Sequence, residues 1–475
     1  MTHTKASQLI VLGNGFDLHC GLKSSYKDFL YYVITQRYTN YFSSDSEEAS
    51  DRNEAIEKAF ADSANYVGVR RIHFDAIYFE RNVKMNDTIF PDINIWYLIL
   101  FHEKLVQSLN QSSNWSDIES VIENYVSGKF IFDNDNGKQS QKKFIDILVD
   151  IFFNYGFERN ILLEGMMEQD EYKLAGLLLY HLLERKDDCY GIKEKIEEIR
   201  KESESHLAWR PGRVQIETKI KNKTKPEVVN ILINLLMGEL HKLEIDFQTY
   251  LTQEVEKEEY KSKAEEFLQT IVMDGDFSLS YSAFSFNYTN SCSGNSGIQV
   301  AFRNVHGALN QNSNESKIIF GIDNISSDSR AEDIGYRFTK SYRTMRLYTE
   351  LENDKAFGDK IDNIFTEDMD VIKFYGHSLA RADYSYFQYI FDMYNLYNSN
   401  IKLIFYYSKI KGRTVEEVRQ EQYRNITKLI EQYGETLDNK AHGRNLLTRL
   451  IQTGRLKIKE IGDYNDHKGR SKKNC

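Results

Sequence analysis

Three glycines near the start of the chain have the residue type and spacing of a nucleotide-binding turn. An apolar run over residues 9–12 leads into Gly13-Asn14-Gly15, and a third glycine, Gly21, precedes an amphipathic pattern typical of a helix. Because glycine has no Cβ, a phosphate or ribose can approach its backbone closely, and the helix behind it presents its positive end to an anion. The spacing is G-x-G-x5-G rather than the dinucleotide fingerprint G-x-G-x-x-G, so an ordinary strand-to-helix turn is the alternative.

Asp17 lies inside the same turn and is a second candidate for contact with a nucleotide. A carboxylate at this place can accept hydrogen bonds from ribose hydroxyls, or it can bond the backbone of its own loop. Ser25 and Asp28 then have the spacing of a capping box, which predicts a helix from about Tyr26.

The segments that must position these residues are strands from both extremities of the sequence. Short apolar or alternating runs predict strands within residues 8–12, 279–290, 297–309, 316–323, 369–383 and 400–408. Gly13, Asn287, His306 and Gly376 fall where four of these runs end. Ligands bind at the carboxyl ends of strands in open α/β sheets, so we expect these four residues to line one cleft.

The middle of the chain is helical in pattern and predicts a large insertion. We expect residues 1–40 and 277–455 to form the nucleotide-binding domain, residues 41–276 a helical insertion, and residues 456–475 a basic C-terminal tail. The strongest helix is predicted to open at Pro226, because proline is favoured in a first turn and an apolar stripe follows.

Composition narrows the class of protein. The chain has 475 residues and a net charge of −10, which argues against a protein that coats nucleic acid. No leader or membrane-length apolar run occurs, so we expect a soluble, cytoplasmic protein without membrane contact. Its four cysteines form no C-x-x-C pair, and we expect no metal site.

Several separate motifs, in order along the chain, resemble the abortive-infection AbiH family of bacterial phage-defence proteins. They are GNGFDLHCGLKSSYKDF, FNYT, VHG, FGID and YGHSLARADYSYF, and NWSDIE at residues 114–119 resembles a W-x-D-x-E segment of that family. The resemblance covers the strand-forming ends of the chain well and the helical block poorly.

AbiH-like chains in turn resemble the sirtuin-like NAD-binding fold, which implies a Rossmann-like, mostly parallel sheet. The three glycines match the spacing of the sirtuin G-A-G-I-S-x-x-x-G motif. Residues 285–289 resemble its T-Q-N-I-D box, His306-Gly307 its H-G pair, and residues 376–379 its G-T-S-L motif. Two departures matter: Thr289 replaces the aspartate of the box, and the paired C-x-x-C zinc module is absent.

The resemblance implies an NAD hydrolase that acts in phage defence. Asn287 would orient a water molecule, and His306 would handle the proton of a ribose hydroxyl. A turn cap is the alternative role of Asn287, a core histidine that of His306, and a helix cap is the favoured role of Asp383. The residues expected to hold NAD are Gly13, Asn14, Gly15, Asp17, Gly21, Thr289, Gly376, His377 and Ser378, although His377 is also consistent with a plain turn residue.

Two other function classes stay open. One is a nucleotide-binding regulatory or sensor module that does not turn NAD over, and the other is a toxin directed at nucleic acid, which the acidic charge disfavours. Sirtuin-like defence enzymes usually oligomerise, so we expect a homo-oligomer. A phage-derived trigger or a second defence protein is a further expected partner.

Overall fold

The computed structural model of the chain contains two compact units. The first comprises Met1–Ser24, Phe247–Ile319 and Arg343–Cys475, and the second Ser25–Asp246 and Phe320–Tyr342. The residues that the structure describes are 6–33, 94–100, 116–126, 129–133, 139–149, 213–290, 298–309, 317–322, 334–353, 364–367, 369–379, 383–410 and 412–462.

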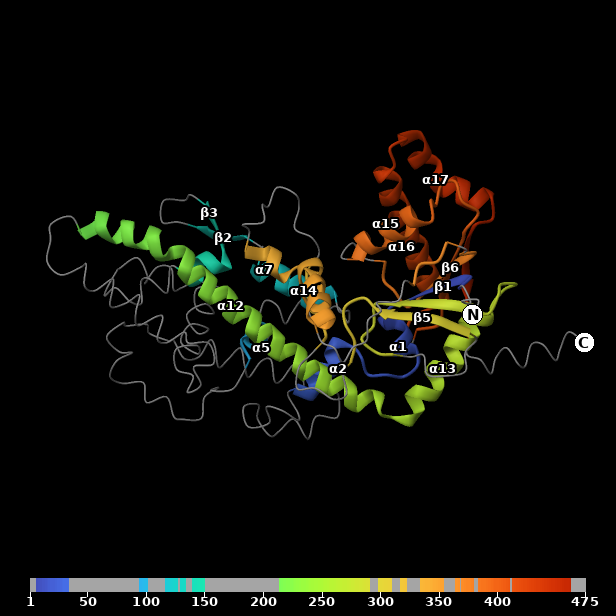
Figure 1. The fold of residues 1–475 in the computed structure, drawn as a ribbon, viewed down its shortest axis with the longest axis horizontal. Helices are drawn as coiled ribbons and strands as arrows, with labels where there is room; N and C mark the ends of the chain where they lie inside the picture. The colour runs from blue at the N-terminus through green and yellow to red at the C-terminus, as the bar shows by residue number, and fades with distance from the viewer. Residues whose placement is uncertain are drawn as a thin grey trace, which may run out of the picture. The chain divides into compact units, whose positions relative to one another are not determined.

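The first unit is built on a six-stranded sheet of order β5-β4-β1-β6-β7-β8. Three of its strands, β1, β5 and β6, are labelled in Figure 1. All five pairings are parallel, so the unit is a mixed α/β structure. The strands are β1 (Gln8–Leu12), β4 (Ser280–Ser285), β5 (Ile298–Asn304), β6 (Val371–Tyr375), β7 (Lys402–Tyr407) and β8 (Leu456–Glu460).

The order of the strands reverses beside β1. The chain proceeds outward from β1 through β4 to β5, then returns to the other side of β1 and proceeds outward again from β6 through β7 to β8. Every residue of β1, β4 and β6 is buried, as expected for central strands of a parallel sheet. The neighbours β1 and β6 therefore flank the reversal point, where open α/β sheets generally bind ligands.

Helices pack on both faces of this sheet. On one face, α15 (Tyr384–Met393), α16 (Val415–Thr436) and α17 (Lys440–Gln452) share a core with residues such as Val11, Phe374 and Phe405. On the other face, Phe267 of α13 (Glu258–Met273) contacts the rings of Tyr375 and of Phe16, which belongs to the short α1 (Asn14–His19).

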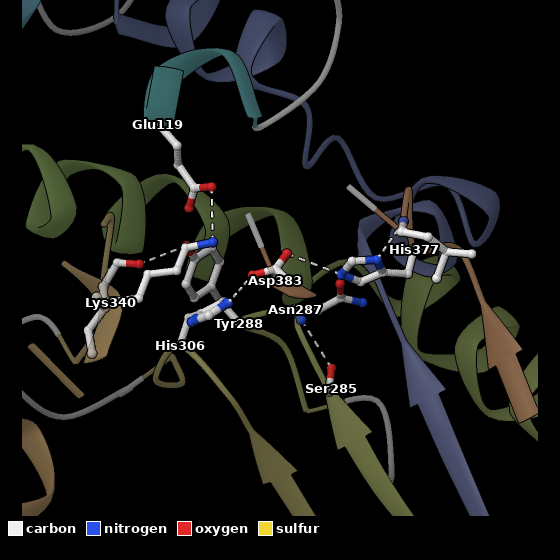
Figure 2. A network of polar contacts seen from close by, with 10 residues as sticks. Glu119, Ser285, Asn287, Tyr288, His306, Lys340, His377 and Asp383 are labelled. Atoms are coloured by element: carbon white, nitrogen blue, oxygen red, sulfur yellow. Dashed lines mark hydrogen bonds and ion pairs between the residues drawn. The ribbon is translucent and has the colours of Figure 1, made fainter. Parts of the chain in front are cut away.

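The second unit is mainly helical. Its described elements include α2 (Tyr26–Tyr32), α5 (Ile95–Leu100), α7 (Ser116–Val126) and η3 (Ile334–Phe338). The helix α12 (Arg213–Val255) belongs to this unit up to Asp246, and α14 (Lys340–Asn353) belongs to it up to Tyr342. Trp96 donates its indole N–H to the Leu236 carbonyl oxygen at 2.9 Å. Lys340 forms an ion pair with Glu119 at 3.0 Å, which Figure 2 shows.

The five strands expected within residues 8–12, 279–290, 297–309, 369–383 and 400–408 are confirmed. The α2 helix also begins as predicted, since the Ser25 hydroxyl accepts a hydrogen bond from the Asp28 backbone N–H.

Four expectations about elements were wrong. Residues 317–322 form no strand, because only Ile322 makes a bridge, to Thr339. The block 41–276 contains the antiparallel pair β2 (Lys129–Asp133) and β3 (Gln139–Lys143). The helix with Pro226 begins earlier, at Arg213, and the segment expected as a tail begins with β8, whose Leu456 and Ile458 pack against the core.

Candidate functional site

The residues predicted at strand ends lie at the same edge of the sheet. Leu12, the last residue of β1, pairs with Ser285 of β4 and with Tyr375 of β6, and Ser285 also pairs with Asn304 of β5. Gly13 and Gly376 follow β1 and β6 directly, while Asn287 and His306 each come two residues after the ends of β4 and β5. The parallel register therefore brings all four to the carboxyl edge.

The glycines of the first turn pack against the turn that follows β6. A Cβ on Gly13 would lie 2.6 Å from the Cα of His377, and one on Gly15 would lie 2.7 Å from the Cα of Gly376. The backbone N–H of Gly13 donates to the Tyr375 carbonyl oxygen, and that of Gly15 to the Gly376 carbonyl oxygen. The close approach of two backbones thus accounts for these glycines without a ligand.

Asp17 is a buried carboxyl group surrounded by donors. Its oxygens accept hydrogen bonds from the hydroxyls of Tyr260, at 2.8 Å, and of Thr289, at 2.9 and 3.1 Å. Burial raises the pKa of Asp17 to about 7, although the hydrogen bonds from Tyr260 and Thr289 and the nearby side chain of Asn287 lower it. Thr289 therefore serves to hold Asp17.

Asn287 lies in the turn after β4, with its backbone held by Asn304 and its side chain beside Asp17. The side-chain NH₂ group of Asn304 donates to the carbonyl oxygens of Asn287 and Thr289, at 2.7 and 2.9 Å. The Asn287 side chain lowers the pKa of Asp17, so it lies close to that carboxylate. Both its amide oxygen and its amide nitrogen are buried, and neither has a hydrogen bond of good geometry among the described residues. Buried polar atoms of this kind call for a partner.

One carboxylate joins the two histidines of the site. The Nε2 atom of His306 lies 3.2 Å from Oδ1 of Asp383, and Nε2 of His377 lies 3.2 Å from Oδ2 of the same residue. Figure 2 shows Asp383 between the two imidazole rings, with His306 beyond the end of β5. Both imidazoles are about one-twentieth exposed, so this cluster is nearly removed from bulk water.

Aromatic rings enclose the two histidines. The Phe286 ring centroid lies 4.4 Å from that of His377 and 5.7 Å from that of His306. Tyr386 and Phe387, in the first turns of α15, contact His306 and His377 respectively. These rings lower the local polarity, which strengthens the electrostatic interactions between the histidines and Asp383.

Three other residues predicted to bind NAD show no structural feature that requires a ligand. Asn14 accepts a hydrogen bond from the Ser24 hydroxyl at 2.6 Å. Gly21 is exposed and has φ +88°, a conformation that favours glycine. Ser378 is exposed, and its carbonyl oxygen accepts a hydrogen bond from Asn425.

The sequence did not identify Asp383 or Tyr260 as site residues. Asp383 does occupy the N-cap position of α15, as its place before an aromatic helix suggested, but its side chain makes no capping hydrogen bond. The one sequence feature that could have connected Asp383 with the site is its position six residues after His377. Nothing in the sequence around Tyr260 connects it to Asp17.

A cavity of about 630 Å³ lies at the opposite, amino edge of the sheet. Its lining includes Asp370, just before β6, and Lys402, the first residue of β7. None of the predicted site residues lines it. Within the described ranges, no group of three or more histidine, cysteine, aspartate or glutamate side chains is placed to hold a metal ion, and no helix is long and apolar enough to cross a membrane.

A family model described as Bacteriophage abortive infection AbiH matches residues 9–407. No curated protein and no solved structure matches the chain. The matched residues span most of the chain and include β4, β5, β6, β7 and all of β1 except Gln8, together with every residue of the carboxyl-edge site described above. Membership of this family suggests a role in abortive infection by phage, and the chain belongs to the AbiH family.

Proposed function

We propose that this AbiH protein acts in abortive infection by hydrolysing NAD to nicotinamide and ADP-ribose. Water attacks C1′ of the nicotinamide ribose, and the C1′–N bond breaks through a transition state with oxocarbenium character. The bonding electron pair leaves with nicotinamide, which departs as a neutral molecule, and the attacking water releases one proton to the solvent. A site for this reaction needs no strong acid, but it must orient the water and hold the ribose.

The order of the strands supports a nucleotide site at the carboxyl edge. Counted along the chain, the sheet has the order 3-2-1-4-5-6, which is the order of doubly wound dinucleotide-binding sheets. We infer from this a Rossmann-like, sirtuin-like core. In such sheets the ligand lies at the reversal point, which in this chain is flanked by β1 and β6.

The buried amide of Asn287, beside the Asp17 carboxylate, carries the proposal. Its oxygen and nitrogen are buried at the carboxyl edge without hydrogen bonds of good geometry among the described residues. A primary amide offers donors and an acceptor, so its oxygen can accept a hydrogen bond from the attacking water while its nitrogen donates one to a ribose oxygen. The backbone of the same turn is fixed by Asn304, which gives the amide a defined position.

His306 supplies the second group that the reaction needs. It is buried at the end of the neighbouring strand and lies against the carboxylate of Asp383. A histidine can take up a proton near neutral pH, and an adjacent carboxylate stabilises the imidazolium that forms. We assign to His306 the proton of a ribose hydroxyl, which the imidazole takes up as the C1′–N bond breaks and returns to the same oxygen after water has added to C1′.

Not all of the other residues predicted to bind NAD keep that role in the proposal. The N–H groups of Gly13 and Gly15 already donate to backbone carbonyl oxygens, so we do not assign phosphate binding to them. Asp17 and Thr289 bind each other, and we propose that they support the turn of Asn287 from behind. The nucleotide would therefore be held mainly beside Asn287 and His306.

A regulatory module that binds a nucleotide without turnover is the second candidate. The observation that favours it is the hydroxyl of Thr289, which donates to Asp17 and does not provide the charge that an aspartate would bring to the ribose. We also propose that the protein works as a homo-oligomer and responds to a phage-derived trigger or to a second defence protein.

Release of nicotinamide from NAD distinguishes the two functions. The purified full chain is incubated with NAD, with and without lysate from phage-infected cells, and nicotinamide is quantified by chromatography while NAD binding is measured by calorimetry. We expect nicotinamide and ADP-ribose in equal amounts. Binding without either product would support the regulatory module, and neither binding nor product would contradict both.

A further inference from the structure

The cavity at the amino edge of the sheet has an excess of negative charge. Its lining includes three exposed carboxylates, those of Asp276, Glu367 and Asp370, and the ammonium group of Lys402. Three carboxylates against one ammonium leave two negative charges in excess. The volume of about 630 Å³ lies within the range that is typical of small-molecule sites.

The charges of this amino-edge cavity are not paired with one another. None of the three carboxylates forms a hydrogen bond or an ion pair with another residue that the structure describes. The Nζ atom of Lys402 lies 5.2 Å from the centroid of the Phe277 ring, which is a cation–π distance, and not against a carboxylate. Like charges around one hollow repel one another and attract cations from solution.

Two hydroxyl groups in the wall of the same cavity also lack a partner. Tyr394 is only 8% exposed and Ser399 is half-buried, and both residues line the cavity. The hydroxyl oxygen of each is buried and makes no hydrogen bond within the described part of the chain. Buried hydroxyls normally have a partner, so this wall offers acceptors to a donor that the protein does not provide.

The spread of these groups defines the kind of cation that fits them. In the described ranges, no three acidic side chains lie close enough together to hold one metal ion. The cavity is also lined by the apolar side chains of Met369, Met393 and Ile401. A matching occupant therefore carries several separated positive charges, which are joined by apolar segments.

We propose that the amino-edge cavity binds a linear polyamine. Its ammonium groups pair with Asp276, Glu367 and Asp370, and its methylene segments pack on the apolar lining, as the stem of a lysine side chain does. A polyamine offers donors and no acceptors, which suits unpaired carboxylates and hydroxyl oxygens. A basic peptide would also bring carbonyl oxygens that need donors. This site does not depend on the reaction proposed for the carboxyl edge.

Calorimetric titration of the full chain with spermine tests the proposal. We expect saturable binding of one molecule, which raises the midpoint of thermal unfolding because the ligand binds the folded state. Affinity should fall from spermine to spermidine to putrescine, since each has one ammonium group fewer than the one before. Added salt should weaken all three interactions, because the carboxylates are exposed.

Neutral variants of the lining carboxylates locate the site. A triple variant with Asp276→Asn, Glu367→Gln and Asp370→Asn should bind spermine about tenfold more weakly or worse. The matched control makes the same change in net charge at three exposed carboxylates outside the lining and should bind like the wild type: Glu431→Gln, Asp438→Asn and Glu460→Gln. If the triple variant does not fold, Glu367→Gln alone should weaken binding about twofold or more.

Three results would overturn the proposal. The first is the absence of spermine binding to the wild type. The second is equal weakening of binding in the lining variant and in its control, which would indicate a general effect of net charge. The third is tighter binding of magnesium ions, or of a lysine peptide with the charge of spermine, than of spermine itself.

Discussion

The backbone N–H of Gly15 donates to the carbonyl oxygen of Gly376 at 2.8 Å, across a contact with no room for a side chain on either residue. Gly15 lies just after β1 and Gly376 just after β6, at the point where the strand order reverses. This contact locks the two turns that flank the reversal point. The position of Asn287 and His306 beside these turns therefore depends on residues more than 300 positions apart in the sequence.

We expect Gly376→Ala to destabilise the protein strongly. Gly376 has φ +74°, and an added Cβ would lie 2.3 Å from the backbone nitrogen of Phe16, so one turn must move. Gly412→Ala is the matched control, because Gly412 has φ +81° with nothing within 4 Å of an added Cβ. Urea unfolding should show a loss of about 1–2 kcal/mol for the control, from backbone strain alone, and clearly more for Gly376→Ala. Equal losses would contradict the packing role of Gly376.

The raised pKa of Asp17 makes stability depend on pH. Burial raises this pKa from 3.8 to about 7, so between these values the folded protein keeps a proton that the unfolded chain has lost. The free energy of unfolding should therefore fall as the pH rises from about 4 to about 7 and level off above that, by up to about 4 kcal/mol in total. Urea unfolding at several pH values measures this effect.

The control for this dependence is Asp17→Asn, which carries no charge at any of these pH values. Its amide oxygen can still accept hydrogen bonds from the hydroxyls of Tyr260 and Thr289. The difference in stability between wild type and variant should move in favour of the variant as the pH rises. A difference that stays constant from pH 4 to pH 8 would show that Asp17 is ionised throughout.

Thr289→Val tests whether Thr289 serves Asp17. The substitution keeps the shape of the side chain but removes the hydroxyl that donates to both carboxylate oxygens. This hydrogen bond lowers the pKa of Asp17, so its loss should raise that pKa further and shift the pH-dependent loss of stability to higher pH. We expect a cost of about 1–3 kcal/mol at pH 8, where the carboxylate is charged and has lost a donor. An unchanged pH profile would mean that Thr289 has another partner.

Five strands, and the residues that follow them at the carboxyl edge of the sheet, could be predicted because they depend on local sequence patterns. The apolar runs of β1, β4 and β6 and the residues at their ends are adjacent in sequence, so alternation and glycine placement identify them. The strand β8 was missed although Leu456 and Ile458 alternate with lysines, because the basic residues that follow it suggested a tail.

The partners within the site were harder to predict, because they are set by tertiary contacts. Asp383 has the sequence position of a helix cap, and only the placement of α15 against β5 and β6 turns its carboxylate toward two histidines. Gly13 and Gly15 have the pattern of a phosphate-binding turn, but their N–H groups bond to the strand-end turn beside them. Residue type alone does not separate these roles.

The kcat of nicotinamide release by Asn287→Ala tests the central claim most directly. The matched control is Asn398→Ala, an exposed asparagine before the start of β7 at the opposite edge of the sheet. We expect Asn287→Ala and His306→Ala each to lower kcat by about a hundredfold or more while the proteins stay folded, and Asn398→Ala to match the wild type. Wild-type turnover that survives in Asn287→Ala would contradict the assignment of the reaction to this edge of the sheet.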